Sequence, residues 1–258
     1  MPASSATLDP AFDRDKFLLR QQALTVNEKY EVWDEQGRAI LFVERPAHLL
    51  RNLGALLGGL LAGGLVGAIC FLVIRLAFGP DPQAMGLLVL AVGLSLLLFG
   101  AAVVVVGTIL SAKRHVTFYR NASRTERLLE IRQDQKLMFV TQRYTVLDAE
   151  GRPIGLFTKN TFSDILRKRW VCSGPQGQTI CVAKEELWHA ILSRTLGKLF
   201  PMNFHFYRAD GAEPIGLFTR RFTILDRYVL DLTGDRLRMV DRRLALALGV
   251  MLDTGERR

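Results

Sequence analysis

Cys172 and Cys181 are the two side chains whose type and spacing most readily suggest chemistry in this sequence. They stand on either side of a Ser-Gly-Pro-Gln-Gly-Gln turn, so they could face each other across a β-hairpin. Such a pair could serve as a redox or acylation site, or could be two small apolar strand residues. The sequence leaves both interpretations open.

The other reactive residue types show no catalytic arrangement. No glycine-rich phosphate-binding loop is present in the sequence. None of the histidines has a metal-ligand spacing or a plausible nucleophile partner: His48, His115, His189 and His205. We therefore assign no catalytic residue, no metal and no cofactor, and we expect a protein that is not an enzyme.

Basic residues are unevenly placed along the chain. The formal net charge is +9, and the excess of Lys and Arg lies almost entirely after residue 112. A basic body beside a membrane is attracted to anionic lipid, and no nucleic-acid-binding motif accompanies the charge. We therefore expect membrane phospholipids, anionic ones, as partners rather than nucleic acid. The residues expected to face lipid are Arg51, Lys113, Arg114, Arg167, Lys168, Arg169, Arg220 and Arg221.

Two long uncharged segments precede most of this basic region. Residues 52–74 and 83–112 contain no charged side chain, and each could cross about 30 Å of hydrocarbon as a helix. A short turn with two prolines and a glycine separates them. We predict a transmembrane hairpin over residues 50–112, with helices at about 52–74 and 85–111. A buried hairpin of a soluble protein is the alternative.

The flanks of the predicted hairpin indicate its orientation. The loop between the helices holds only Arg75 and Asp81 as charged residues. Five basic residues stand just outside the two spans: Arg45, Arg51, Lys113, Arg114 and Arg120. The positive-inside rule then places both termini in the cytoplasm. We expect a two-span protein of the plasma membrane.

Regularly spaced glycines indicate how the two helices could pack. Glycines at spacings of four or seven let helix backbones approach closely in lipid. The candidates are Gly59, Gly63, Gly67, Gly86, Gly93, Gly100 and Gly107. They could form a seam within the hairpin or between protomers of a homo-oligomer, or they could reflect the general frequency of glycine in membrane helices.

The soluble part contains a threefold repeat. Segments starting at Tyr30, Tyr144 and Phe204 each place a glycine seven residues after the aromatic residue, and the last two continue as Ile-Gly-Leu-Phe-Thr. Each segment is expected to be a strand, a turn with a glycine at positive φ, and a second strand. Second hairpin-like pieces follow at residues 113–129, 168–182 and 226–240. Three units of about four strands predict about twelve strands, with the transmembrane hairpin inserted in the first unit.

The segment at residues 241–253 contains nine consecutive apolar residues, Leu244–Leu252, which are too few to span a bilayer. A closed barrel of about twelve strands is too wide for its own side chains to fill, and a helix that is apolar on every side must be buried. We therefore predict that this helix runs through the barrel. Its core residues would be Leu244, Leu246, Leu248, Val250 and Leu252. The alternative is a last strand followed by a surface helix.

These features resemble the tubby-like superfamily, and within it the phospholipid scramblase and LURP-one-related branch. The resemblance rests on the repeats, the terminal apolar helix and the opening of the soluble part at residues 17–34. It covers residues 14–49 and 113–253. It implies a 12-stranded barrel around a central helix and an association with membrane lipids. Unlike animal scramblases, this chain has an internal membrane hairpin and no recognisable acidic calcium loop.

The sequence thus predicts a mainly β protein with an inserted helical hairpin. Residues 1–13 would form a tail, and residues 14–49 and 113–258 would form a cytoplasmic barrel. The expected function is that of a membrane-anchored module that binds or organises lipids. Phospholipid scrambling by an oligomer and a non-catalytic scaffold that binds other proteins are the two alternatives.

Overall fold

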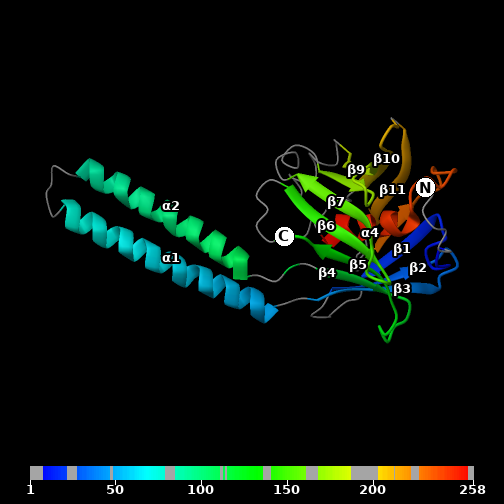
Figure 1. Ribbon diagram of the computed structural model, residues 1–258, viewed down its shortest axis with the longest axis horizontal. Helices are drawn as coiled ribbons and strands as arrows, with labels where there is room; N and C mark the ends of the chain where they lie inside the picture. Colours follow the sequence, from blue (N-terminus) through cyan, green and yellow to red (C-terminus); the bar gives the residue numbers. More distant parts are fainter. Residues whose placement is uncertain are drawn as a thin grey trace. The chain divides into compact units, whose positions relative to one another are not determined.

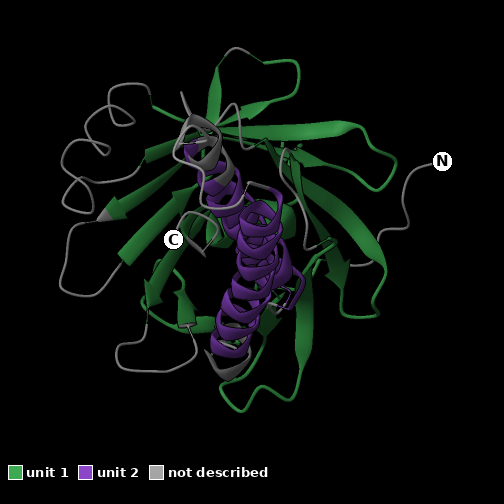
Figure 2. Ribbon diagram, turned by 90° about the vertical axis from the view of Figure 1, so that its left-hand side faces the viewer, with its two compact units in different colours: residues 1–47, 114–258 green, residues 48–113 purple. Residues whose placement is uncertain are grey.

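The structure, a computed structural model, divides into two compact units, which are residues 1–47 with 114–258 and residues 48–113 (Figure 2). The first unit is a β-barrel and the second is a pair of helices (Figure 1). The residues that the structure describes are 8–21, 28–46, 49–78, 85–110, 113, 115–135, 141–160, 168–186, 203–211, 213–221 and 227–254.

Within the described residues, twelve antiparallel strands form a closed barrel. Each strand pairs with its neighbours along the chain, and β1 pairs with β12 to close the circle. The strands are β1 (Lys16–Gln21), β2 (Glu28–Trp33), β3 (Ala39–Arg45), β4 (His115–Tyr119), β5 (Arg127–Gln133), β6 (Thr141–Asp148), β7 (Pro153–Asn160), β8 (Arg169–Ser173), β9 (Thr179–Glu185), β10 (Asn203–Arg208), β11 (Pro214–Arg221) and β12 (Arg227–Asp231). The predicted closed barrel is confirmed.

Alternate side chains of the strands point into the barrel, as the two-residue period of a strand requires. In β1, for example, Phe17 and Leu19 are buried while Leu18 between them is exposed. The largest fully buried side chains include Tyr30, Phe118, Tyr144, Phe157, Trp170, Phe204, Phe206, Phe218 and Tyr228. Most of the barrel's large aromatic residues therefore face its interior.

A single helix, α4 (Arg242–Thr254), fills the barrel along its interior (Figure 1). The predicted core residues Leu244, Leu246, Leu248, Val250 and Leu252 are at most 1% exposed. The helix begins and ends one residue later than the predicted range 241–253. Because helix and strands bury their apolar faces against each other, the core lies between α4 and the barrel wall.

The repeated Ile-Gly-Leu-Phe-Thr motif has its explanation in this packing. Gly155 of β7 and Gly216 of β11 both face inward. A Cβ atom on Gly155 would lie 2.6 Å from Leu244 Cδ2, and one on Gly216 would lie 2.7 Å from Leu232 Cδ2. Neither distance is compatible with van der Waals contact. A side chain at Gly155 would displace Leu244, and one at Gly216 would also meet the Asp231 backbone oxygen at 2.9 Å. Glycine therefore allows the central helix and the segment leading to it to pack closely against the wall.

The twelfth strand comes from an unexpected part of the chain. The sequence pattern suggested a fourth strand in the third repeat, within residues 226–240, but only β12 (Arg227–Asp231) forms there. After β12 the chain turns, with Arg238 at a positive φ of 50°, and enters α4. β1, from the N-terminal segment, pairs with β12 and occupies the position of the missing fourth strand of the third unit. The predicted strand number is right, but the predicted third unit is one strand short.

Three hairpin turns use glycine in the left-handed region, where L side chains are strained. Gly37, Gly151 and Gly177 have φ values of 78°, 81° and 85°. The first two belong to the repeat motif as predicted. Gly211, the glycine of the third repeat, has no such φ value, so the prediction of a positive φ is wrong there. In the third repeat the glycine stands four residues before the isoleucine, against three in the other two, and the β10–β11 turn has a different backbone conformation.

The second unit consists of α1 (Leu49–Phe78) and α2 (Met85–Leu110). Both are longer than most helices of soluble proteins. The segments Leu53–Ala77 and Val92–Leu110 are long and apolar enough to cross a membrane. Most of their large side chains are exposed, including Leu61, Leu76 and Leu97. A long helix pair with an apolar surface suits lipid better than water.

Candidate functional site

The antiparallel order of the strands gives the barrel two distinct rims. All odd-numbered strands end, and all even-numbered strands begin, at the same rim. Because the helical unit is inserted between the end of β3 and the start of β4, we call this the near rim. The opposite rim, which carries the β2–β3, β6–β7 and β10–β11 turns and the start of α4, is the far rim.

Basic residues lie at strand ends around the near rim. They are Arg20 at the end of β1, Arg45 at the end of β3, Lys168 and Arg169 at the start of β8, Arg220 and Arg221 at the end of β11, and Arg227 at the start of β12. The topology thus brings four of the residues named from the sequence, 168, 169, 220 and 221, to one rim.

The other predicted lipid-facing residues are placed as follows. Lys113 is exposed between α2 and β4. Arg51 belongs to α1, where its side chain is not described, and Arg114 and Arg167 lie outside the described residues. The structure therefore gathers part of the predicted basic set. It leaves four members without a described side-chain position, which are Arg51, Arg114, Arg167 and Arg221.

Carboxylates pair with the basic residues of the far rim. Arg38 Nε lies 2.9 Å from Asp34 Oδ2, and Arg152 Nε lies 2.8 Å from Asp148 Oδ2, so two turns of the repeat carry the same ion pair. Further pairs at this rim are Arg120–Glu126, Arg208–Asp210, Arg238–Asp13 and Arg243–Asp241. Far-rim charge is thus largely neutralised within the protein.

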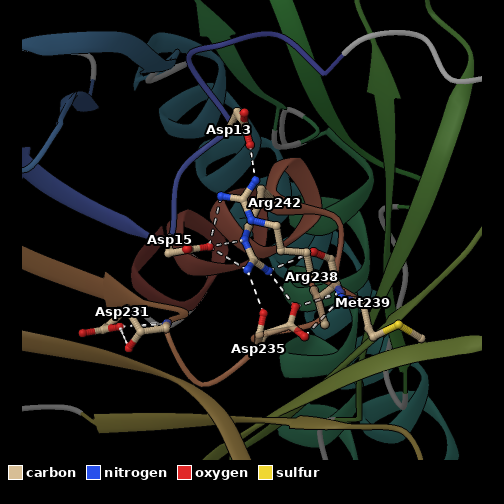
Figure 3. Close-up of polar contacts among 9 residues, drawn as sticks. Asp13, Asp15, Asp231, Asp235, Arg238, Met239 and Arg242 are labelled. Atoms are coloured by element: carbon tan, nitrogen blue, oxygen red, sulfur yellow. Dashed lines mark hydrogen bonds and ion pairs between the residues drawn. The ribbon is translucent and has the colours of Figure 1, made fainter.

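A buried ion pair fixes the start of the central helix (Figure 3). Arg242 Nη1 donates to Asp235 Oδ2 at 2.6 Å, and Arg242 Nη2 donates to Asp15 Oδ1 at 2.7 Å. Asp235 also accepts from the backbone N–H groups of Met239 and Val240. Burial raises the pKa of Asp235, but these hydrogen bonds and the guanidinium outweigh it and hold the pKa below its usual value. The cluster is structural, because its polar atoms are used within the protein.

A groove of about 520 Å³ lies where β1 and β12 close the barrel. Its apolar part comes from the outward-facing Leu18, Trp33 and Val229, which are neighbours in the register of β2, β1 and β12. The next outward row towards the near rim holds Arg20 and Arg227, directly opposite each other. The volume lies within the range of about 300–1,000 Å³ typical of small-ligand sites.

The two arginines of this groove differ from the paired cations of the far rim. The guanidinium carbon of Arg20 lies 4.5 Å from the centre of the Trp33 ring. Among the described residues, no carboxylate forms an ion pair with Arg20 or Arg227. Lys16, at the other end of the groove, lies 3.4 Å from Asp231. Glu31 of β2 is the register partner of Arg20, so the near-rim end of the groove holds two arginines and one carboxylate.

The described interior of the barrel contains the two cysteines singled out from the sequence. Cys172 lies opposite Cys181 in the register of β8 and β9, which confirms that they face each other, and both are buried. Hydrogen bonding with Cys181 and burial raise the pKa of the Cys172 thiol well above its ordinary value. Nucleophilic sulfur chemistry needs the thiolate, so the geometry favours two small core residues over a reactive pair.

Buried polar atoms at the other end of α4 are likewise paired within the protein. The Asp253 carboxylate accepts hydrogen bonds from the hydroxyl groups of Tyr30 and Tyr228. In the part of the chain that the structure describes, no group of three or more His, Cys, Asp or Glu side chains could hold a metal ion.

Three of the predicted glycines lie in the seam between α1 and α2. A Cβ on Gly59 would lie 2.7 Å from the Val103 carbonyl oxygen, and one on Gly63 would lie 2.9 Å from the Phe99 carbonyl oxygen. Gly107 faces Ala55. Gly67 is within ordinary contact distance of Phe99, whereas Gly93 and Gly100 have no neighbour within 4 Å. Gly86 belongs to α2, and the surroundings of this residue are not described.

A closed barrel of twelve antiparallel strands around a buried C-terminal helix defines the tubby-like class of proteins. Within that class, the chain belongs to the LURP-one-related family, whose model matches residues 102–253. Comparisons with curated proteins and with solved structures gave no match. Family membership confirms the resemblance drawn from the sequence.

The groove residues Arg20, Trp33 and Arg227 were not singled out from the sequence. Each stands in a segment that indicated the fold, and nothing in those segments marks the three residues as a binding site. Only the closure of β1 on β12 makes the two arginines neighbours. To predict this groove from the sequence, one would have to know that β1 pairs with β12.

Proposed function

We propose that the protein is a membrane-anchored, non-catalytic module that binds anionic phospholipid with the near rim of its barrel. The observation that carries this proposal is the placement of basic residues from five strands at the rim where the chain leaves β3 for α1 and returns from α2 to β4. Each Lys or Arg close to an anionic leaflet adds about 1 kcal/mol of attraction.

Chain connectivity supports the choice of this rim. Only residues 46–48 and 111–114 connect β3 and β4 to the two long helices. An extended chain covers at most about 3.6 Å per residue. If α1 and α2 cross a membrane, the ends of β3 and β4 must therefore lie close to its surface. The positive-inside rule makes that surface the cytoplasmic one.

Orientation can be tested with reporters on the full chain. A reporter placed at Pro82, between the two apolar segments, should lie outside the cytoplasm, while reporters at both termini should lie inside. A cytoplasmic signal from Pro82 would contradict the two-span anchor.

Lipid preference can be measured on the full chain in a neutral detergent. Native mass spectrometry with added phosphatidylserine or phosphatidylcholine should show more bound phosphatidylserine, and the preference should weaken at high salt because exposed charges are screened. The double variant Lys168→Gln/Arg169→Gln should bind less phosphatidylserine. Arg236→Gln removes an exposed far-rim charge and should not. Equal binding of the two lipids would overturn the proposal.

Lipid scrambling makes a different prediction. Lipid headgroups need polar groups along their path through a membrane. Within α1 and α2 the charged residues are Arg51 and Arg75, which lie towards the two ends of α1. We therefore expect the full chain, reconstituted in vesicles with fluorescent phospholipid, to leave transbilayer movement unchanged. Accelerated movement would favour scrambling over a binding module.

A further inference from the structure

The groove at the barrel closure contains an arrangement that strand pairing alone disfavours. Arg20 and Arg227 stand directly opposite each other on the outer face of β1 and β12, and like charges in that position destabilise a sheet. Arg221 of β11 is in turn the register partner of Arg227. Glu31 of β2 is the register partner of Arg20 on its other side, and its carboxylate accepts a hydrogen bond from Trp33 Nε1. The row therefore holds one carboxylate beside two arginines, and an anionic ligand would balance the remaining positive charge.

The conformation of Arg20 leaves its donors available. Its guanidinium carbon lies over the Trp33 ring, 4.5 Å from the ring centre, a contact that does not use the N–H groups of the guanidinium. None of these N–H groups donates to another described residue. Guanidinium groups bind phosphate well because their N–H groups form paired bonds to its oxygens. Two arginines match a phosphomonoester, which carries about two negative charges at neutral pH.

The rest of the groove indicates which kind of group is attached to the phosphate. Leu18 and Val229 are cross-strand neighbours in the next outward row, and Leu18 is 38% exposed. Farther along, the Lys16–Asp231 pair closes the groove. Arg20 is four positions along the strand from Lys16, which is about 13 Å at 3.3 Å per residue. This length, with a volume of about 520 Å³, suits one apolar chain rather than two.

We infer that the β2–β1–β12 groove binds a single-chain lipid phosphomonoester, with its phosphate on Arg20 and Arg227 and its chain along Leu18 and Val229. The inference rests on the proposed lipid-binding function and narrows it to one ligand class. It also assigns the two arginines a task distinct from that of the other near-rim cations. Those cations attract anionic lipid in general, whereas the groove recognises one molecule.

The experiment is a calorimetric titration of the full chain in phosphatidylcholine nanodiscs with octyl phosphate or inorganic phosphate. Octyl phosphate should bind in a saturable way and at least tenfold more tightly than inorganic phosphate. Arg227→Gln should weaken octyl phosphate at least tenfold, and Arg20→Gln/Arg227→Gln should abolish saturable binding. Leu18→Ala should weaken octyl phosphate but not inorganic phosphate. Arg236→Gln, the matched control, should stay within twofold of the parent.

Three results would overturn the inference. The first is equal affinity for octyl phosphate and inorganic phosphate, which would indicate a site for free phosphate. The second is unchanged octyl phosphate binding in the double arginine variant, and the third is unchanged binding at pH 5, where the monoester has lost about one charge. Thermal melting separates misfolding from lost contacts, because removing like charges should not lower the melting temperature. If phosphatidylserine preference persists while octyl phosphate fails, the groove assignment falls and the proposed function stands.

Discussion

Leu248 is fully buried in the centre of α4, between that helix and the barrel wall. Replacing it with Asp would place a charge there with no partner, which costs several kcal/mol or forces the carboxyl to stay protonated. We predict that Leu248→Asp lowers the melting temperature of the full chain by well over ten degrees or prevents its accumulation.

Leu237 provides the matched control, because it is 76% exposed in the turn before α4. Leu237→Asp should change stability by about 0.5 kcal/mol or less. Similar melting temperatures for the two variants would show that α4 is not the core of the barrel.

Asp235 makes the barrel sensitive to acid. Its pKa is lowered in the folded state, so its contribution to stability is present above the unfolded pKa of about 3.9 and disappears as the pH falls through the lower folded value. We predict that the melting temperature drops between about pH 5 and pH 2, and that Asp235→Asn lowers stability at pH 7 and flattens this drop.

Glu35→Gln, at an exposed position in the β2–β3 turn, should leave the acid profile unchanged. A profile of Asp235→Asn that runs parallel to the parent would show that another carboxylate controls acid unfolding.

At the scale of elements, the contact between β7 and α4 depends on one missing side chain. A Cβ on Gly155 would lie 2.6 Å from Leu244 Cδ2 and 3.2 Å from the Ser173 carbonyl oxygen. Overpacking of this kind costs about 1–3 kcal/mol. We predict that Gly155→Ala destabilises the barrel, and that Leu244→Ala added to it costs less than the sum of the two single changes.

Gly211→Ala is the control at the β10–β11 turn, where the nearest side-chain atom would be 3.4 Å away. Denaturant unfolding of the four variants measures the coupling. If the free-energy changes of Gly155→Ala and Leu244→Ala simply add in the double variant, the two residues are not in steric contact.

The elements also show which parts of the fold could be predicted. Charge-free length identified α1 and α2, and the apolar segment without a polar side identified α4 as the core, since both signals are local. β1 gave no such signal, because the place of the short strand Lys16–Gln21 in the barrel depends on its pairing with β12, which is far away in the sequence. The near-rim position of Lys168 and Arg169 follows from strand direction, but the Arg20–Arg227 pair depends on the closure itself.

At the scale of the whole molecule, the inserted hairpin and the barrel form separate compact units. β3 pairs directly with β4, for example through Phe42 and Tyr119, so the sheet does not need the helices to connect them. We predict that a variant with residues 48–113 replaced by a short Gly/Ser turn remains folded in the absence of detergent.

Circular dichroism and a cooperative melting transition would measure this outcome. The reciprocal fusion of residues 48–113 to an unrelated soluble protein should still direct that protein to membranes. Aggregation of the shortened barrel at all temperatures would show that the two units depend on each other.

The pairing of β1 with β12 has a consequence for biosynthesis. A ribosome releases β1 first, then the two apolar helices, and only at the end β12 and α4. Until then β1 and the growing sheet have unpaired edges, which are sites of aggregation in incomplete β-proteins. The two helices, synthesised early, would hold the unfinished sheet at a membrane surface and apart from other nascent chains. The sheet would stay there until β12 and α4 are synthesised and the barrel can close.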